Sequence, residues 1–217
     1  MEKYNGKGAN ATNPEKIPIT VYVPIRDDIR QLYELIHEVT HTFDIENGDT
    51  PTRRVLGEVA PQCMERLLDD FLLEMSDEDM KKYGFNRNKM EQDIKDRKIS
   101  TFLSRFNNAQ ALYRGSRNRE LDSRYMLAQI YSAHFNKFDK LQKKNKLVSF
   151  IKCVSDDKFD MANNAFSLSI DRKANLNRFY RDNYVGFAIS EAVNLITTKT
   201  QSKPIQYQKE LENKERD

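Results

Sequence analysis

Two histidines four residues apart are spaced so that they could share a metal ion, and a glutamate follows the first of them. The segment His37-Glu38-Val39-Thr40-His41 lies in a stretch whose apolar residues recur at helical spacing. On a helix, side chains four positions apart project from one face, so both imidazoles can reach one ion. Such an ion lowers the pKa of a bound water to about 7, and Glu38 could take its proton as the water attacks a carbonyl. The spacing therefore predicts metal-assisted hydrolysis of a peptide bond, with Zn²⁺ as the ion.

A catalytic zinc ion needs a third protein ligand and one open coordination position. A third histidine six residues after His41 is excluded because that position is Asn47. Glu58 is the preferred ligand, because it lies early in the next predicted helix, after a loop that lets the chain reverse. Asp44 is the alternative, because it lies seven residues after His37 on the same helical face.

The motif is predicted to lie among helices that follow one strand. Residues 17–23 are rich in β-branched residues and have a proline near each end, which is typical of an edge strand. An edge of this kind could also take up an extended peptide as an added strand. Asp27 or Asp28 can cap the helix that carries the motif, and a short helix is expected after Ser76. Apolar periodicity predicts helices at about 28–43, 53–75, 88–113, 117–142, 145–154 and 171–199.

The composition is that of a polar globular protein, with 38% hydrophobic and 32% charged residues among 217. We expect a single domain at 17–200, between a flexible or edge-like N-terminal tail at 1–16 and a charged C-terminal tail at 201–217. A net charge of +3 does not call for a nucleic-acid partner or an anionic membrane. No apolar run approaches the roughly 20 residues that span a bilayer.

Cys63 and Cys153 each lie within an apolar-periodic segment, so they are expected to be small buried residues and not a disulfide. The first sixteen residues contain no apolar stretch of the kind found in signal peptides, and the expected compartment is the cytoplasm. The remaining histidine, His134, lies in an aromatic stretch and is expected to pack or face solvent.

Two stretches of the chain resemble the thimet oligopeptidase and oligoendopeptidase F family. The strand at 16–23 and the following helix with its HEVTH motif resemble the family's strand and active-site helix. The segment from Gly57 to Glu65 resembles the place where the family carries a glutamate ligand and, seven residues later, a second glutamate. The resemblance implies that Glu58 is the third ligand and that Glu65 holds a histidine ring. It also implies a mainly α-helical, zincin-type catalytic domain of the gluzincin class, with a small N-terminal strand or hairpin and one Zn²⁺.

A weaker resemblance covers residues 180–191, which look like the family's tyrosine-rich helix. It implies that Tyr184, with Tyr180, donates to the substrate carbonyl and its developing oxyanion. Taken without the family, both are ordinary aromatic residues of a helix face. The chain departs from the family at Phe187, where many members have a tyrosine, and at Asn175, roughly where they have a histidine.

The resemblance implies a zinc metalloendopeptidase that acts on oligopeptides or extended protein segments. Family enzymes are several times longer before this region, where a further helical lobe forms one wall of the substrate channel. A homodimer or a partner protein is therefore expected in place of the missing N-terminal lobe. The alternative is a catalytically weak or inactive peptidase-like binding or regulatory protein that retains the zinc site.

Overall fold

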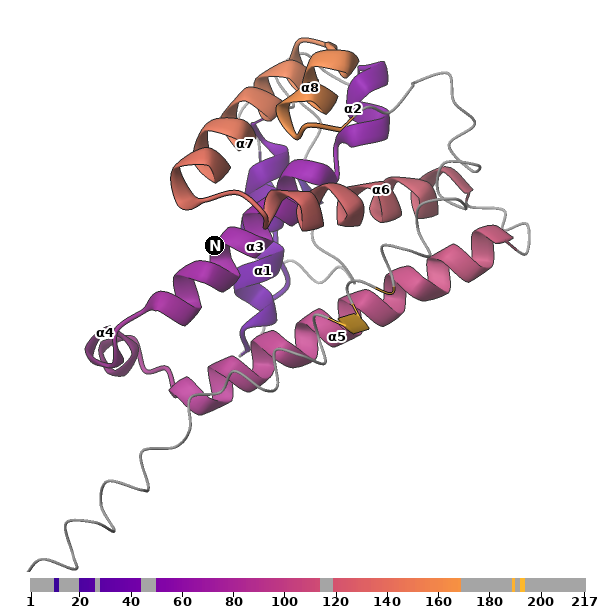
Figure 1. The fold of residues 1–217 in the computed structure, drawn as a ribbon. Coiled ribbons are helices and arrows are strands. Elements are labelled where there is room, and N and C mark those ends of the chain that lie inside the picture. Colours follow the sequence, from indigo (N-terminus) through magenta and orange to yellow (C-terminus); the bar gives the residue numbers. More distant parts are fainter. Residues whose placement is uncertain are drawn as a thin grey trace, which may run out of the picture.

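The structure is a computed structural model of the 217-residue chain. It describes residues 10–11, 20–25, 28–43, 50–113, 119–168, 189 and 192–193. This part of the chain forms eight helices and one two-stranded antiparallel sheet (Figure 1). The mainly α-helical fold with a small N-terminal strand pair is therefore confirmed. Within the described ranges, no helix has both the length and the apolar character that crossing a membrane requires.

The two strands lie beside the helix that carries the histidines. β1 (Asn10–Ala11) pairs with β2 (Val21–Tyr22), with Asn10 opposite Tyr22. β2 falls within the predicted strand, and β1 falls within the segment expected to be a tail or an edge. Both strands contact α1 (Arg30–His41), so this small ribbon covers part of that helix.

α1 begins where an acidic side chain accepts a hydrogen bond from one of the free backbone N–H groups of the helix. One carboxylate oxygen of Asp28 accepts a hydrogen bond from the backbone N–H of Arg30 at 2.9 Å, and the other binds the Arg30 guanidinium. The first N–H groups of a helix have no partner within the helix, so a side-chain acceptor here stabilises the start. The predicted start near Asp28 is confirmed, and the helix ends at His41.

The helix predicted at 53–75 is two helices, α2 (Pro51–Leu56) and α3 (Val59–Glu74), separated by Gly57 and Glu58. A Cβ atom on Gly57 would lie 2.6 Å from the backbone oxygen of Arg53, which is closer than side-chain carbons approach a carbonyl. The turn therefore requires glycine. The prediction of one helix was wrong because the apolar periodicity continues across the break, and periodicity carries no information about such a close approach.

The remaining helices are α4 (Asp77–Lys82), α5 (Arg87–Tyr113), α6 (Arg119–Phe135), α7 (Lys140–Ser155) and α8 (Phe159–Ala165). The short helix predicted after Ser76 is α4, and the Ser76 hydroxyl accepts the N–H of Asp79 at 3.0 Å. α7 begins earlier than predicted because Asp139 and Gln142 form a capping box there. The helix predicted at 171–199 lies outside the described residues, apart from three helical positions.

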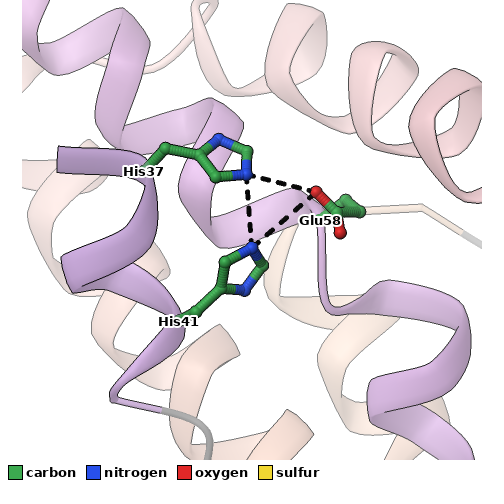
Figure 2. Close-up of side chains that lie close together, drawn as sticks. All are labelled: His37, His41 and Glu58. Carbon is green, nitrogen blue, oxygen red and sulfur yellow. Dashed lines mark hydrogen bonds and ion pairs between the residues drawn. The ribbon is translucent and has the colours of Figure 1, made fainter. Parts of the chain in front are cut away.

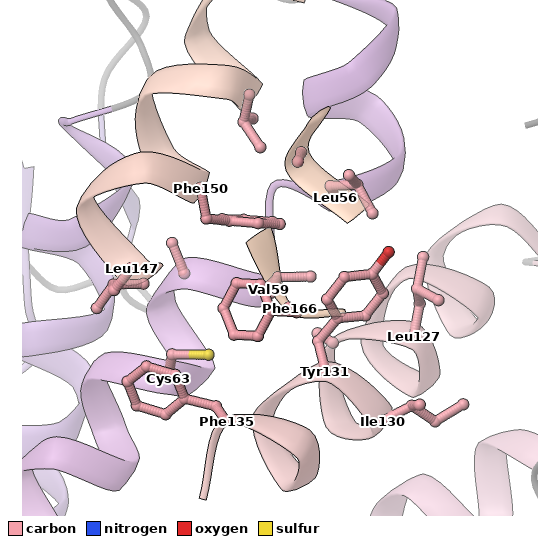
Figure 3. Packing of buried hydrophobic residues seen from close by; sticks show 14 of the residues in the cluster. Leu56, Val59, Cys63, Leu127, Ile130, Tyr131, Phe135, Leu147, Phe150 and Phe166 are labelled. Carbon is pink, nitrogen blue, oxygen red and sulfur yellow. The ribbon is translucent and has the colours of Figure 1, made fainter. Parts of the chain in front are cut away.

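The main hydrophobic core lies among α2, α3, α6, α7 and α8 (Figure 3). The Phe166 ring lies at its centre, with the ring centroids of Tyr131, Phe135 and Phe150 at 4.9 to 5.8 Å. Cys63 and Cys153 are free thiols buried in this cluster, as predicted.

A second, smaller core lies where α1, α4 and the start of α5 meet the C-terminal half of α3. Its buried members are Tyr33, Leu72, Met80, Met90 and Ile94. α3 belongs to both cores, because its first turns pack into the main core and Leu72 packs into the second. α3 is therefore held along its whole length, and the polar side chains that it presents to α1 stand on a rigid support.

We predict that Phe150→Ala lowers the free energy of unfolding by about 3–5 kcal/mol, because it leaves a cavity in the main core. Val148→Ala is the matched control, since Val148 lies on the same helix with 61% of its surface exposed, while Phe150 is fully buried. The control is expected to stay within about 0.5 kcal/mol of the wild type. Urea unfolding measures both, and equal losses in the two variants would contradict this assignment of the core.

Candidate metal centre

α1 packs against α3, and the two helices run in opposite directions. Near the start of α1, Tyr33 contacts Asp69 of α3. One turn further along α1, His37 contacts Glu65 of α3. His41, one further turn along, lies close to Glu58 at the start of α3. The residues of α1 are four positions apart and therefore share one face, which is turned toward the acidic residues of α3.

Three of these side chains converge on one point (Figure 2). The Nε2 atoms of His37 and His41 lie 3.2 Å apart. Oε2 of Glu58 lies 3.3 Å from the first and 3.8 Å from the second. Glu58, the preferred third ligand, therefore lies beside the two histidines of the HEVTH motif, while the alternative, Asp44, lies outside the described residues.

This spacing fits a tetrahedral metal ion. Ligand atoms about 2.0–2.1 Å from a tetrahedral ion lie roughly 3.3–3.4 Å apart, and three protein ligands leave a fourth position for water or substrate. The three observed separations of 3.2, 3.3 and 3.8 Å cluster around that value. His37, His41 and Glu58 could therefore hold a metal ion with little rearrangement.

The environment of Glu58 also favours a cation. The residue is only 7% exposed, and its buried Oε2 atom faces Nε2 of His37 and of His41 as ion-pair contacts without a well-aligned hydrogen bond. Its other oxygen lies 3.8 Å from a guanidinium nitrogen of Arg124 on α6. A buried carboxylate oxygen without a hydrogen bond costs free energy, and a metal ion bound at Oε2 would remove that cost.

The protonation of the two histidines differs when no metal is bound. Burial acts to lower the pKa of His37, but the carboxylates of Glu58 and Glu65 outweigh it and raise this pKa to about 10. Burial lowers the pKa of His41 to about 4, although Glu58 opposes the shift. At neutral pH His37 is therefore protonated and His41 is neutral, so the pair carries one positive charge, and a bound cation would take the place of the extra proton between the same acidic groups.

Glu65 determines how the His37 ring is turned. Its Oε1 atom lies 2.8 Å from Nδ1 of His37. Burial acts to raise the pKa of Glu65, but His37 and Arg97 hold it below its usual value, so the carboxylate is ionised and only accepts. Nδ1 therefore carries the hydrogen, and in the neutral ring Nε2 presents its lone pair to the site. This is the ring contact that the resemblance implied for Glu65.

Glu38 lies on α1 and is partly buried. Burial raises the pKa of Tyr125 on α6, and the negative charges of Glu58 and Glu38 add to this shift. Both carboxylates therefore act electrostatically on the Tyr125 phenol. Tyr125 and Arg124 were missed by sequence reasoning because no local motif marks them.

Several predicted residues lie outside the part of the chain that the structure describes. These are the tyrosines of the weaker resemblance, the two departures from it and the alternative ligand: Tyr180, Tyr184, Phe187, Asn175 and Asp44. Their predicted roles stay predictions.

Comparison with models of known protein families, with curated proteins and with solved structures gives no match to this chain.

We predict that Gly57→Ala weakens metal binding by about tenfold or more, because the new Cβ atom pushes on the Arg53 carbonyl and shifts the neighbouring candidate ligand Glu58. Gly84→Ala is the control. Gly84 has a φ of +75° and open space around it, so alanine there costs about 1 kcal/mol of stability without touching the site. Calorimetric titration with Zn²⁺ as the probe ion measures affinity. Unchanged affinity in Gly57→Ala would show that the turn does not position Glu58.

Proposed function

We propose that this protein is a zinc-dependent peptidase, with His37, His41 and Glu58 as the metal ligands. The observation that carries the proposal is the convergence of their three ligand atoms at 3.2 to 3.8 Å, directly beside a glutamate in the HEVTH motif. Two imidazoles and one carboxylate, with a fourth position left for water, form the donor set of catalytic zinc sites in peptidases. Zinc is the preferred ion, although similar donors bind other divalent metals.

The proposed reaction is the addition of water to a peptide bond. Bound zinc would lower the pKa of its water and polarise the substrate carbonyl. Glu38 takes a proton from the water as the water oxygen forms a bond to the carbonyl carbon. Glu38 then passes that proton to the amide nitrogen, the C–N bond breaks, and an amine and a carboxylic acid leave. Each step needs Glu38 ionised at the start and within hydrogen-bond reach of the water.

The resemblance to the thimet oligopeptidase and oligoendopeptidase F family supports the same reading. In that reading, Tyr184 with Tyr180 donates to the carbonyl oxygen, and the substrate is an oligopeptide or an extended segment of a protein. The resemblance rests on short motifs.

A second candidate is a peptidase-like binding protein that holds zinc without turning over substrate. Phe187 and Asn175 favour it, because they stand where the family has a tyrosine and a histidine that assist the reaction. The two candidates share the metal site and differ only in cleavage, so metal content and activity must be measured separately.

The metal site is tested by Glu58→Gln. The wild type is expected to bind about one Zn²⁺ per chain, and Glu58→Gln is expected to lose most of it because an amide is a poor zinc ligand. Glu74→Gln makes the same change on the same helix, at an exposed glutamate paired with Lys140, and is expected to keep its zinc. Elemental analysis after dialysis against trace zinc measures the content. A wild type that binds no zinc would overturn the proposal.

The hydrolytic step is tested by Glu38→Gln in a fluorescent peptide-library assay. The variant is expected to keep zinc and to lose at least about 100-fold in kcat, since an amide cannot accept the proton. Glu34→Gln, one turn earlier on the same helix, is the matched control and is expected to stay within about threefold of the wild type. Stoichiometric zinc in a wild type that cleaves no peptide would favour the binding protein.

A further inference from the structure

We propose that Arg97 on α5 is a positioning residue for the metal centre and holds His37 in place through Glu65. The proposal rests on the metal site of the proposed function. It extends that site from the ligands on α1 and α3 to a third helix.

Arg97 bridges two carboxylates that lie one turn apart on α3. Its Nη1 atom donates to Oε2 of Glu65 at 2.8 Å, and Nη2 donates to Oδ1 of Asp69 at 3.0 Å. A planar guanidinium presents its two outer nitrogens in a fixed fork, so the two contacts restrain each other. The side chain is only 14% exposed, so solvent competes little for these hydrogen bonds.

α1 confines the same guanidinium from another direction. The Cζ atom of Arg97 lies 3.6 Å from the ring centroid of Tyr33, which is a cation–π contact. The Tyr33 hydroxyl in turn donates to Asp69. The guanidinium is thus held by a ring of α1 and by two carboxylates of α3, and it cannot turn without breaking one of these contacts.

Arg97 matters for the metal centre because the two oxygens of the Glu65 carboxylate have different partners. Arg97 occupies Oε2, which leaves Oε1 facing Nδ1 of His37 at 2.8 Å. Without that anchor, the carboxylate can rotate about the terminal side-chain torsion of Glu65, which has a broad range of allowed angles, and can move away from the imidazole. Loss of Arg97 would then free the His37 ring to leave the orientation in which Nε2 faces His41 and Glu58.

The direction in which zinc affinity changes on removal of Arg97 distinguishes a positioning role from an effect of its positive charge alone. A positive charge near a bound cation repels it, so removing Arg97 would strengthen zinc binding if its field were all that mattered. Positioning predicts the opposite, a loss of affinity. Lys98 is the natural comparison, because it is the next residue of α5 and pairs with Oδ2 of Asp69 at 3.2 Å.

The experiment measures zinc affinity by competition with a chelating dye in the full-length protein. Arg97→Met is expected to weaken binding roughly 10- to 100-fold, the usual range for residues that support metal ligands. Arg97→Lys keeps the charge but loses the fork, so it is expected to fall between Arg97→Met and the wild type. Lys98→Met, which also removes a positive charge beside Asp69, is expected to stay within about threefold of the wild type.

A double-mutant cycle tests whether Arg97 acts through Glu65. Arg97→Met is expected to cost little further affinity in a Glu65→Gln background, because the contact that it supports is already changed. The absorption spectrum of the Co²⁺-loaded protein should change in Arg97→Met and not in Lys98→Met, since it reports ligand geometry. Thermal unfolding with a chelator present checks that each variant is folded before affinities are compared.

Each outcome is decisive. Zinc affinity in Arg97→Met equal to or above that of the wild type overturns the positioning role and leaves the metal site standing. Fully additive losses in the cycle also overturn it. If Arg97→Met does not fold, Arg97→Lys decides alone, and an affinity equal to that of the wild type refutes the proposal. A wild type without zinc refutes the proposed function itself.

Discussion

The burial of ionisable side chains between α1 and α3 is the constraint on which the rest of the structure depends. A charge removed from water must find a partner, because an unpaired buried charge costs several kcal/mol. Here Glu65 finds His37 of α1 and Asp69 finds Tyr33 of α1, and both also bind Arg97 of α5. Glu58, just before α3, lies close to the protonated His37 of α1 and to Arg124 of α6. These pairs fix the register of the two helices, since a slide by one turn would leave each carboxylate opposite the wrong group.

The two hydrophobic cores make that register rigid. The first turns of α3 pack in the core formed with α2, α6, α7 and α8, and its far end packs against α4, α5 and the start of α1 (Figure 1). Groups that must hold a metal need a support that does not move when the metal binds, and helices packed at both ends provide one. The polar contacts between α1 and α3 lie between the two cores.

The absence of any match to known families, curated proteins or solved structures is compatible with a familiar motif. A metal site of this kind needs two histidines, a glutamate ligand and a base in a defined geometry, and that geometry places few demands on the helices further away. The short segments on which we base the proposed likeness to the thimet oligopeptidase and oligoendopeptidase F family contain these groups. α5 and α6 supply Arg97, Arg124 and Tyr125, to which no local pattern points.

The sequence by itself determined the parts of the site that depend on local geometry. Helical periodicity places His37 and His41 on one face, and this follows from 3.6 residues per turn whatever surrounds the helix. Which distant group completes the site was decided only by the tertiary structure. Glu58 reaches the histidines because α2 and α3 break at Gly57, where the close approach to the Arg53 carbonyl excludes any side chain. Arg97 and Asp69 join the network around the candidate site for the same physical reason. A buried charge pairs with whichever opposite charge lies close to it in space. That closeness comes from the packing of helices far apart in the chain, which no local sequence pattern encodes.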